Sequence, residues 1–184
     1  VCRSAVAGTL RWEKSLRWAG ARDVLGLSVQ GDRLYLSAAE SVGEQAAYHL
    51  RCWSVTDGRE LWEAHALNPV KDLYHGQQVK RPVLLGGIVA FESGMFDATT
   101  GSRWTPKGRE PDWILSRPGH ACGGMTGGDG GLLFRADNPT FFRLEDGSFT
   151  RLSPTRPGCW LNILPAEGGV LIPEASASCI CGYP

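Results

Sequence analysis

Short apolar strands alternate with glycine turns along most of this chain. Three segments repeat one pattern: an alternating apolar and polar strand, an Asp-Gly or Thr-Gly turn, and a second strand that carries a large aromatic side chain. A partial copy of the pattern lies near the start of the chain. The copies occupy residues 8–12, 52–62, 95–104 and 142–149. This pattern predicts hairpins, because glycine adopts the positive φ of a tight turn and the residue before it can hydrogen-bond the turn backbone.

The turn glycines recur at a nearly constant interval. Gly8, Gly58, Gly101 and Gly147 are separated by 50, 43 and 46 residues. That interval is the length of one four-stranded blade of a β-propeller.

A second repeated element precedes each complete copy: two more candidate strands joined by a turn. The later strand of each pair includes its turn, at residues 31–36, 86–91, 130–134 and 168–172. The earlier strands are predicted at residues 24–29, 82–85, 122–126 and 160–164. Such apolar runs are typical of strands that are buried on both faces. No segment keeps a helical period over three turns, and residues 38–50 are interpreted as a long hairpin loop. The fold class predicted is therefore all-β, with four-stranded antiparallel sheets.

Similar turns also occur in β-sandwiches and barrels, so that alternative stays open. The aromatic at a matched offset after the turn favours a propeller, because radially packed sheets repeat such a position at blade period. The residues at this offset are Trp12, Trp62, Trp104 and Phe149. Four blades are predicted, roughly at residues 20–65, 78–107, 119–152 and 158–184, with residues 8–14 as the outer strand of a neighbouring blade.

Residues 96–104 resemble the blade signature of the pyrroloquinoline-quinone-type (quinoprotein-like) propeller repeats, Asp-x-x-Thr-Gly-x-x-x-Trp, with the Gly–Trp interval one residue shorter. Residues 54–62 match it more loosely. In that family the tryptophan of the outer strand docks against the next blade, which is the role implied for Trp12, Trp62 and Trp104. Such propellers usually have seven or eight blades, so the resemblance implies that this chain is part of a larger ring. A four-bladed ring that pairs its first strand with an incomplete last blade is the alternative.

A narrower resemblance covers about sixty residues near the C-terminus. Segments 119–123, 156–162 and 173–181 are similar to the last blades of an uncharacterised group of bacterial extracytoplasmic propeller proteins. The resemblance implies a periplasmic or secreted protein and brings no known activity. The quinone itself is not expected, because the chain lacks a vicinal cysteine pair and a recognisable cluster of calcium ligands.

The cysteines are the residues that point most directly to chemistry. Cys2 and Cys52 are interpreted as buried thiols. In an oxidising compartment, disulfides are expected among the four later cysteines. The alternative is a copper or zinc site. Residues i and i+2 of a strand point to one side, so Cys179 and Cys181 would present two sulfurs together, with His120 and Cys122 completing the ligand set. The candidate disulfide residues are Cys122, Cys159, Cys179 and Cys181, and the candidate metal ligands are His120, Cys122, Cys179 and Cys181.

Composition narrows the function classes further. The chain has 19 Lys+Arg and 19 Asp+Glu, so no basic field is available to attract nucleic acid. No apolar run is long enough for a transmembrane segment. His49, His65 and His75 are placed in or beside loops and interpreted as solvated or structural, and no nucleophile elbow or Walker loop is present. A non-catalytic propeller that binds other blades, chains or proteins as a scaffold is therefore predicted. A redox or metal-binding propeller domain, or a degenerate quinoprotein dehydrogenase, is the alternative.

Overall fold

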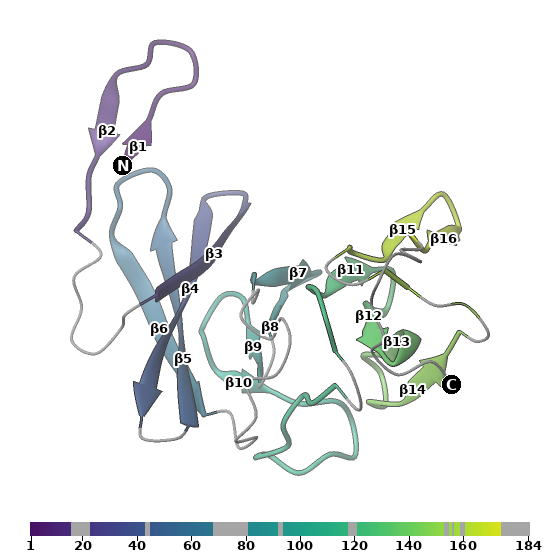
Figure 1. Ribbon diagram of the computed structural model, residues 1–184. Helices are drawn as coiled ribbons and strands as arrows, with labels where there is room; N and C mark the ends of the chain where they lie inside the picture. Colours follow the sequence, from purple (N-terminus) through teal and green to yellow (C-terminus); the bar gives the residue numbers. More distant parts are fainter. Residues whose placement is uncertain are drawn as a thin grey trace.

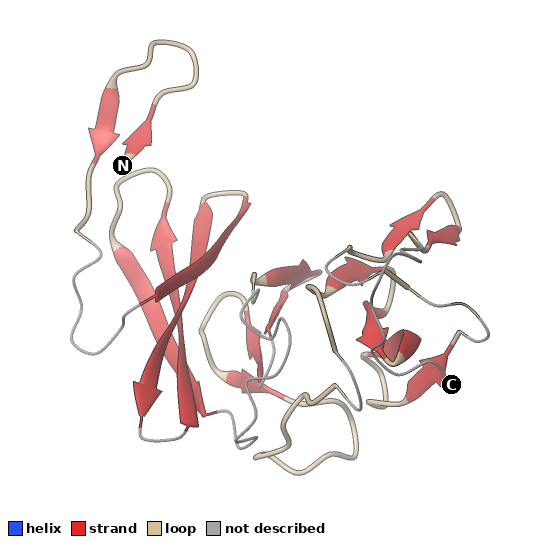
Figure 2. Cartoon of the chain, in the orientation of Figure 1, coloured by secondary structure: helices blue, strands red, loops and turns tan. Residues whose placement is uncertain are grey.

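The protein is all-β, as the sequence predicts. The structure, a computed structural model, describes residues 1–15, 23–42, 45–67, 81–91, 94–117, 121–152, 155, 157–158 and 161–173. Within these residues Figure 2 shows strands and loops and no helix. Accordingly, no helix in the described ranges has the length and apolar character needed to cross a bilayer.

Three antiparallel sheets of four strands follow one another along the chain, each in the order of the sequence. The first contains β3 (Asp23–Gln30), β4 (Arg33–Val42), β5 (Gln45–Ser54) and β6 (Glu60–Leu67). The second contains β7 (Val83–Leu85), β8 (Ile88–Phe91), β9 (Gly94–Asp97) and β10 (Arg103–Trp104). The third contains β11 (Thr126–Gly128), β12 (Gly131–Ala136), β13 (Asn138–Arg143) and β14 (Phe149–Arg151). Two-stranded sheets lie before and after them: β1 (Cys2–Arg3) with β2 (Leu10–Trp12), and β15 (Leu164–Ala166) with β16 (Gly169–Leu171).

The interpretation of residues 38–50 as a loop is wrong. Strands β4 and β5 extend through this segment and pair without a break from Arg33↔Ser54 to Val42↔Gln45. The segment contains four Ala and two Glu, which have low strand propensity, so its pattern hides the strands. Burial of small side chains such as Ala38 and Ala47 between larger neighbours overrides that propensity.

Two of the earlier strands also begin later than predicted. β11 begins at Thr126 and β15 at Leu164, near the ends of the predicted segments 122–126 and 160–164. Both strands contain glycine or proline. These residues are typical of turns, so a short strand that contains them is hard to recognise from the sequence.

The turn between the third and fourth strand has the same hydrogen bonds in all four copies. The residue at the start of the turn donates its N–H to the carbonyl five residues later, and the glycine donates its N–H back to the carbonyl of the starting residue. The starting residues are Ser4, Ser54, Asp97 and Arg143. Gly8, Gly58, Gly101 and Gly147 have φ between 66° and 73°, which confirms the positive φ predicted for them.

A further hydrogen bond joins this turn to the first hairpin of each complete sheet. The residue after the starting residue donates its N–H to a carbonyl of that hairpin: Val55 to Asp32, Ala98 to Gly87, and Leu144 to Gly130. The three sheets are therefore copies of one unit at the level of individual hydrogen bonds.

The apolar core lies between neighbouring sheets. One cluster joins the first and second sheets and includes Tyr35, Trp62 and Phe91. Another joins the second and third sheets and includes Met95, Leu132 and Phe134. The first strands of the sheets lie in succession, because β3 contacts β7, β7 contacts β11, and β11 contacts β15 (Figure 1).

Candidate functional site

Trp62 joins the first sheet to the second. It lies on the edge strand β6, is 9% exposed, and donates its indole N–H to the carbonyl of Ala98 at 3.2 Å. Its ring covers the turn of the second sheet so closely that a Cβ added to Gly101 would lie 2.7 Å from it. The absence of a side chain at Gly101 thus makes room for the indole.

Trp12 makes the same contact with the first sheet. Its indole N–H donates to the carbonyl of Val55 at 2.7 Å, and an added Cβ at Gly58 would lie 2.7 Å from its ring. Val55 and Ala98 occupy the same position in their turns. The β1–β2 hairpin therefore attaches to the first sheet as the first sheet attaches to the second. We call each such contact between a side chain and the next turn a joint.

Trp104 lies at the same register on β10 but does not form a joint. A bulge adds one residue to the strand before Trp12 and before Trp62, and β10 lacks this bulge. As a result, each of the three tryptophans lies opposite the residue two positions before the start of its turn, which is Cys2, Cys52 or Met95. Trp104 is partly buried and packs against the cluster between the second and third sheets. At the third joint, Pro106 and Arg109 cover Gly147 instead, and Arg109 donates to the Gly147 carbonyl at 2.9 Å.

Phe149 does not correspond to the tryptophans. Thr150 lies opposite Phe141, the position that the tryptophans face in the other sheets, whereas Phe149 lies opposite Phe142. Phe149 follows Gly147 by two residues, whereas Trp62 follows Gly58 by four and Trp104 follows Gly101 by three. Because successive strand residues point to opposite faces, the assignment of Phe149 to the tryptophan position is wrong.

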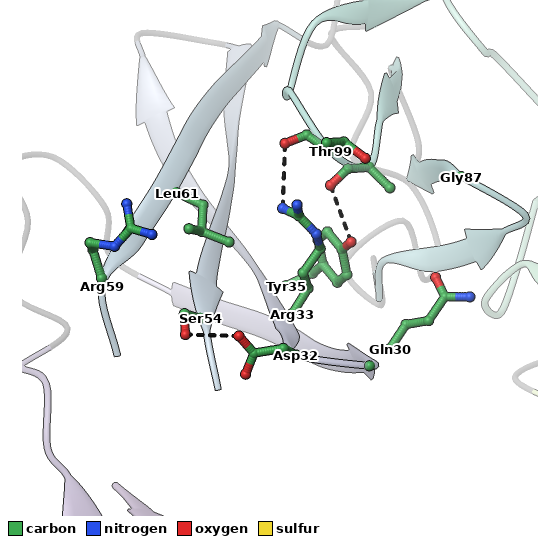
Figure 3. A pocket seen from close by; sticks show the side chains of 11 residues that line it. Gln30, Asp32, Arg33, Tyr35, Ser54, Arg59, Leu61, Gly87 and Thr99 are labelled. Carbon is green, nitrogen blue, oxygen red and sulfur yellow. Dashed lines mark hydrogen bonds between the residues drawn. The ribbon is translucent and has the colours of Figure 1, made fainter. Parts of the chain in front are cut away.

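A cleft of about 520 Å³ opens beside the joint of the first and second sheets (Figure 3). Polar side chains of β4 that line the cleft donate hydrogen bonds to the last turn of the second sheet. Tyr35 donates its hydroxyl hydrogen to the Ala98 carbonyl at 3.2 Å, and Arg33 donates to the Thr99 carbonyl at 3.4 Å. Burial raises the pKa of the Tyr35 phenol and of the neighbouring Cys52 thiol, so both keep their protons near neutral pH.

Asp32 fastens the first hairpin of the first sheet to its last turn. Its carboxylate accepts hydrogen bonds from the backbone N–H and the hydroxyl of Thr56, at 2.8 and 2.7 Å, and from the hydroxyl of Ser54 at 3.1 Å. The Thr56 side-chain hydrogen bond is the main cause that holds the pKa of Asp32 below its ordinary value.

This lowered pKa predicts a loss of stability in acid. The stabilisation from Asp32 is present above the unfolded-state pKa of about 3.9 and is lost as the pH falls through the lower folded-state value. We expect Asp32→Asn to be less stable than the parent at pH 6 and to lose less stability between pH 6 and pH 3, measured by urea unfolding. Asp129→Asn, at the exposed tip of the β11–β12 hairpin, is the matched control. An equal acid sensitivity in the parent and Asp32→Asn would contradict the assignment.

The predicted cysteine sites fall largely outside the described residues. Cys159, Cys179, Cys181 and His120 are not described, and Cys122 is buried. No disulfide joins two cysteines of the described ranges. The predicted disulfides and the predicted Cys/His metal site therefore stay predictions.

Two of the histidines predicted to lie in or beside loops instead lie on neighbouring strands. His49 is in β5 and His65 is in β6, and the two are directly paired across the strands. Glu63 completes a set of three side chains whose ligand atoms all lie within 4.8 Å of one another. The sequence carries no direct signal for this pair, because a plain count outward from the Gly58 turn pairs His49 with Ala64, and only the bulge beside Cys52 brings His65 opposite His49. His75 lies outside the described residues.

Comparisons with known proteins concern the fold alone. No protein-family model and no curated protein matches the chain. The chain is similar to a solved structure titled "Crystal structure of the computationally designed Ika4 protein", with a TM-score of 0.53 and 12% identity, over 86% of this chain and 91% of the designed one. The resemblance to quinoprotein-like repeats therefore rests on the sequence motifs.

Proposed function

We propose that this chain forms consecutive blades of a β-propeller and acts as a non-catalytic scaffold that binds protein strands. The observation that carries the proposal is the repetition of one hydrogen-bonded unit, with the first strands of successive sheets in contact. Radial packing of like sheets around an axis accounts for that repetition, whereas a sandwich does not require it. An extracytoplasmic location rests on the resemblance of the C-terminal segments, and the quinoprotein-like architecture rests on the turn motif.

The two short sheets are complementary halves of the same unit. The β15–β16 turn, with positive φ at Glu167 and Gly168, corresponds to the hairpin of the first two strands. The β1–β2 turn has the hydrogen bonds of the third and fourth strands. A β15–β16 hairpin joined to a β1–β2 hairpin would therefore make one complete four-stranded blade.

Both halves expose apolar side chains that such pairing would cover. Leu164, Val170 and Leu171 of the last hairpin are 45%, 40% and 58% exposed, and Leu10 of the first is 52% exposed. Unpaired strand edges with apolar side chains readily add another strand. The partner we propose is the complementary hairpin of the same propeller, either from this chain or from another copy.

The register that we propose for this pairing is the one that the three complete sheets share. In each, the starting residue of the last turn lies opposite the residue that follows the first turn, as in Ser54↔Arg33, Asp97↔Ile88 and Arg143↔Gly131. The same register places Cys2 opposite Leu171. The pair two residues before the turn is not directly hydrogen-bonded, and its Cα atoms lie about 4.5 Å apart, within the range that a disulfide bridges.

Leu171→Cys should therefore form a disulfide with the native Cys2 under mild oxidation. Peptide mapping by mass spectrometry would identify the bond, and non-reducing electrophoresis would show whether it lies within one chain or joins two. Val170→Cys is the matched control, because its side chain points to the opposite face and should not react with Cys2. A folded Leu171→Cys protein that lacks this bond in both monomer and dimer, or equal cross-linking of the two variants, would refute the complementary-hairpin proposal.

A further inference from the structure

A cluster of histidines and carboxylates lies on the face of the first sheet that points away from the second sheet. His49, Glu63 and His65 form its centre, and Glu40 and Arg51 flank it. Strand alternation explains the separation: Tyr48, Leu50 and Trp62 point into the core between the sheets, and the residues between them point to the other side. The core packing and the joints do not use these charged groups.

One ligand atom from each of His49, Glu63 and His65 lies within 4.8 Å of the other two. The Nδ1 atoms of His49 and His65 are 2.8 Å apart, with the rings at 86° to one another. Oε1 of Glu63 is 3.8 Å from Nδ1 of His49 and 3.6 Å from Nε2 of His65. Two imidazoles and one carboxylate are thus held by directly neighbouring strands, β5 and β6, at positions fixed by strand pairing.

These separations fit a small divalent ion. Zinc binds nitrogen and carboxylate oxygen at about 2.0–2.2 Å, which sets distances of about 3.3 Å between ligand atoms in a tetrahedral site. The 2.8 Å between the two Nδ1 atoms is below that value, and the 3.8 Å from Nδ1 of His49 to Oε1 of Glu63 is slightly above it. The 3.6 Å contact of Glu63 is made by the other ring nitrogen of His65, so the His65 side chain, which is 61% exposed, would have to rotate to place a single nitrogen on an ion shared with His49 and Glu63.

The surrounding residues supply the outer contacts that such a site needs. Oε1 of Glu40 lies 3.3 Å from Nε2 of His49, so it can accept the ring proton there and let Nδ1 bind a metal. Arg51 donates to Oε2 of Glu63 at 3.0 Å, which orients the carboxylate and leaves Oε1 available. Carboxylates behind ligating histidines commonly fix the tautomer and strengthen metal binding.

We propose that His49, Glu63 and His65 form a binding site for zinc or a similar divalent transition metal. The ligands are two nitrogens and one oxygen, with a fourth position open to water on the exposed side of His65. Nitrogen and oxygen donors in this number favour zinc, copper(II) or nickel over calcium or magnesium. The site shares no residue with the Cys/His group predicted near the C-terminus.

The test is zinc and cobalt titration of the tag-free protein. Isothermal titration calorimetry should show one zinc ion per chain, with affinity that falls as the pH is lowered because protons compete for the imidazoles. Cobalt should give visible bands without the near-ultraviolet charge-transfer band that thiolate ligands produce. His65→Ala and Glu63→Gln should weaken zinc binding at least tenfold, and Glu40→Gln should weaken it by about 10–100-fold through its contact with His49.

Matched variants distinguish zinc binding by these three side chains from binding elsewhere on the chain. Glu60→Gln removes a carboxylate that contacts Arg51 and Trp53 on the same face but is not part of the three-residue set, so zinc affinity should remain. Cys179→Ser with Cys181→Ser should also leave it unchanged. Circular dichroism checks that each variant is folded. Unchanged zinc binding in both His65→Ala and Glu63→Gln, or loss only in the cysteine variant, would overturn the proposal.

Discussion

Replacing Trp62 with alanine should lower the free energy of unfolding by about 3–5 kcal/mol, as expected for a large buried aromatic. The substitution removes the ring that packs against Tyr35, at 5.9 Å between centroids, and the hydrogen bond to Ala98. It also leaves a cavity over the turn of the second sheet. Urea unfolding followed by far-ultraviolet circular dichroism would measure the loss.

Two further tryptophan variants test the reason for this loss. Trp62→Phe keeps most of the apolar contact and loses the N–H, so it should be less damaging than Trp62→Ala. Trp104→Ala should also cost less than Trp62→Ala, because Trp104 is only partly buried and forms no joint. A Trp62→Ala protein as stable as the parent, or less affected than Trp104→Ala, would show that the joint does not hold the sheets together.

Adding one methyl group at Gly101 should also be costly. Gly101 has φ of 73°, so an alanine there is strained by about 1–2 kcal/mol. The added Cβ would also lie 2.7 Å from the Trp62 ring, and such overpacking costs about 1–3 kcal/mol more. The expected total for Gly101→Ala is therefore about 2–5 kcal/mol, measured by the same urea unfolding.

Gly108→Ala is the matched control for this experiment. Gly108 has φ of 80°, and an added Cβ would meet nothing within 4 Å. It should show the backbone strain alone, about 1–2 kcal/mol. Equal losses at Gly101 and Gly108 would mean that the Trp62 contact imposes no steric requirement on the turn.

The local features of this fold could be predicted from the sequence. Positive φ at Gly58 or Gly101 follows from the turn motif, because only a few residues around the glycine determine it. The all-β class and the division into four-stranded sheets follow from the spacing of these turns. Each of these predictions depends on short segments in which the local sequence pattern alone indicates the conformation.

Features that depend on register could not be predicted in the same way. A bulge of one residue changes the count from a turn glycine to the position that faces the next sheet. Trp62 follows such a bulge and Trp104 does not, yet both lie at the same register, whereas Phe149 does not. The His49 and His65 pair depends on the strand that replaces the expected loop at residues 38–50. The cover that Pro106 and Arg109 provide over Gly147 comes from an irregular segment that carries no repeat signal.

The joints have a consequence for how the repeats can diverge. Each joint involves only two adjacent sheets, so its side chains need to match one neighbouring turn and no other part of the molecule. Trp62 meets this requirement at one joint, and Pro106 with Arg109 meets it at another with different chemistry. Each copy can therefore change its sequence independently while the backbone hydrogen bonds of the turns are retained, so the repeats can lose sequence similarity long before they lose their common shape.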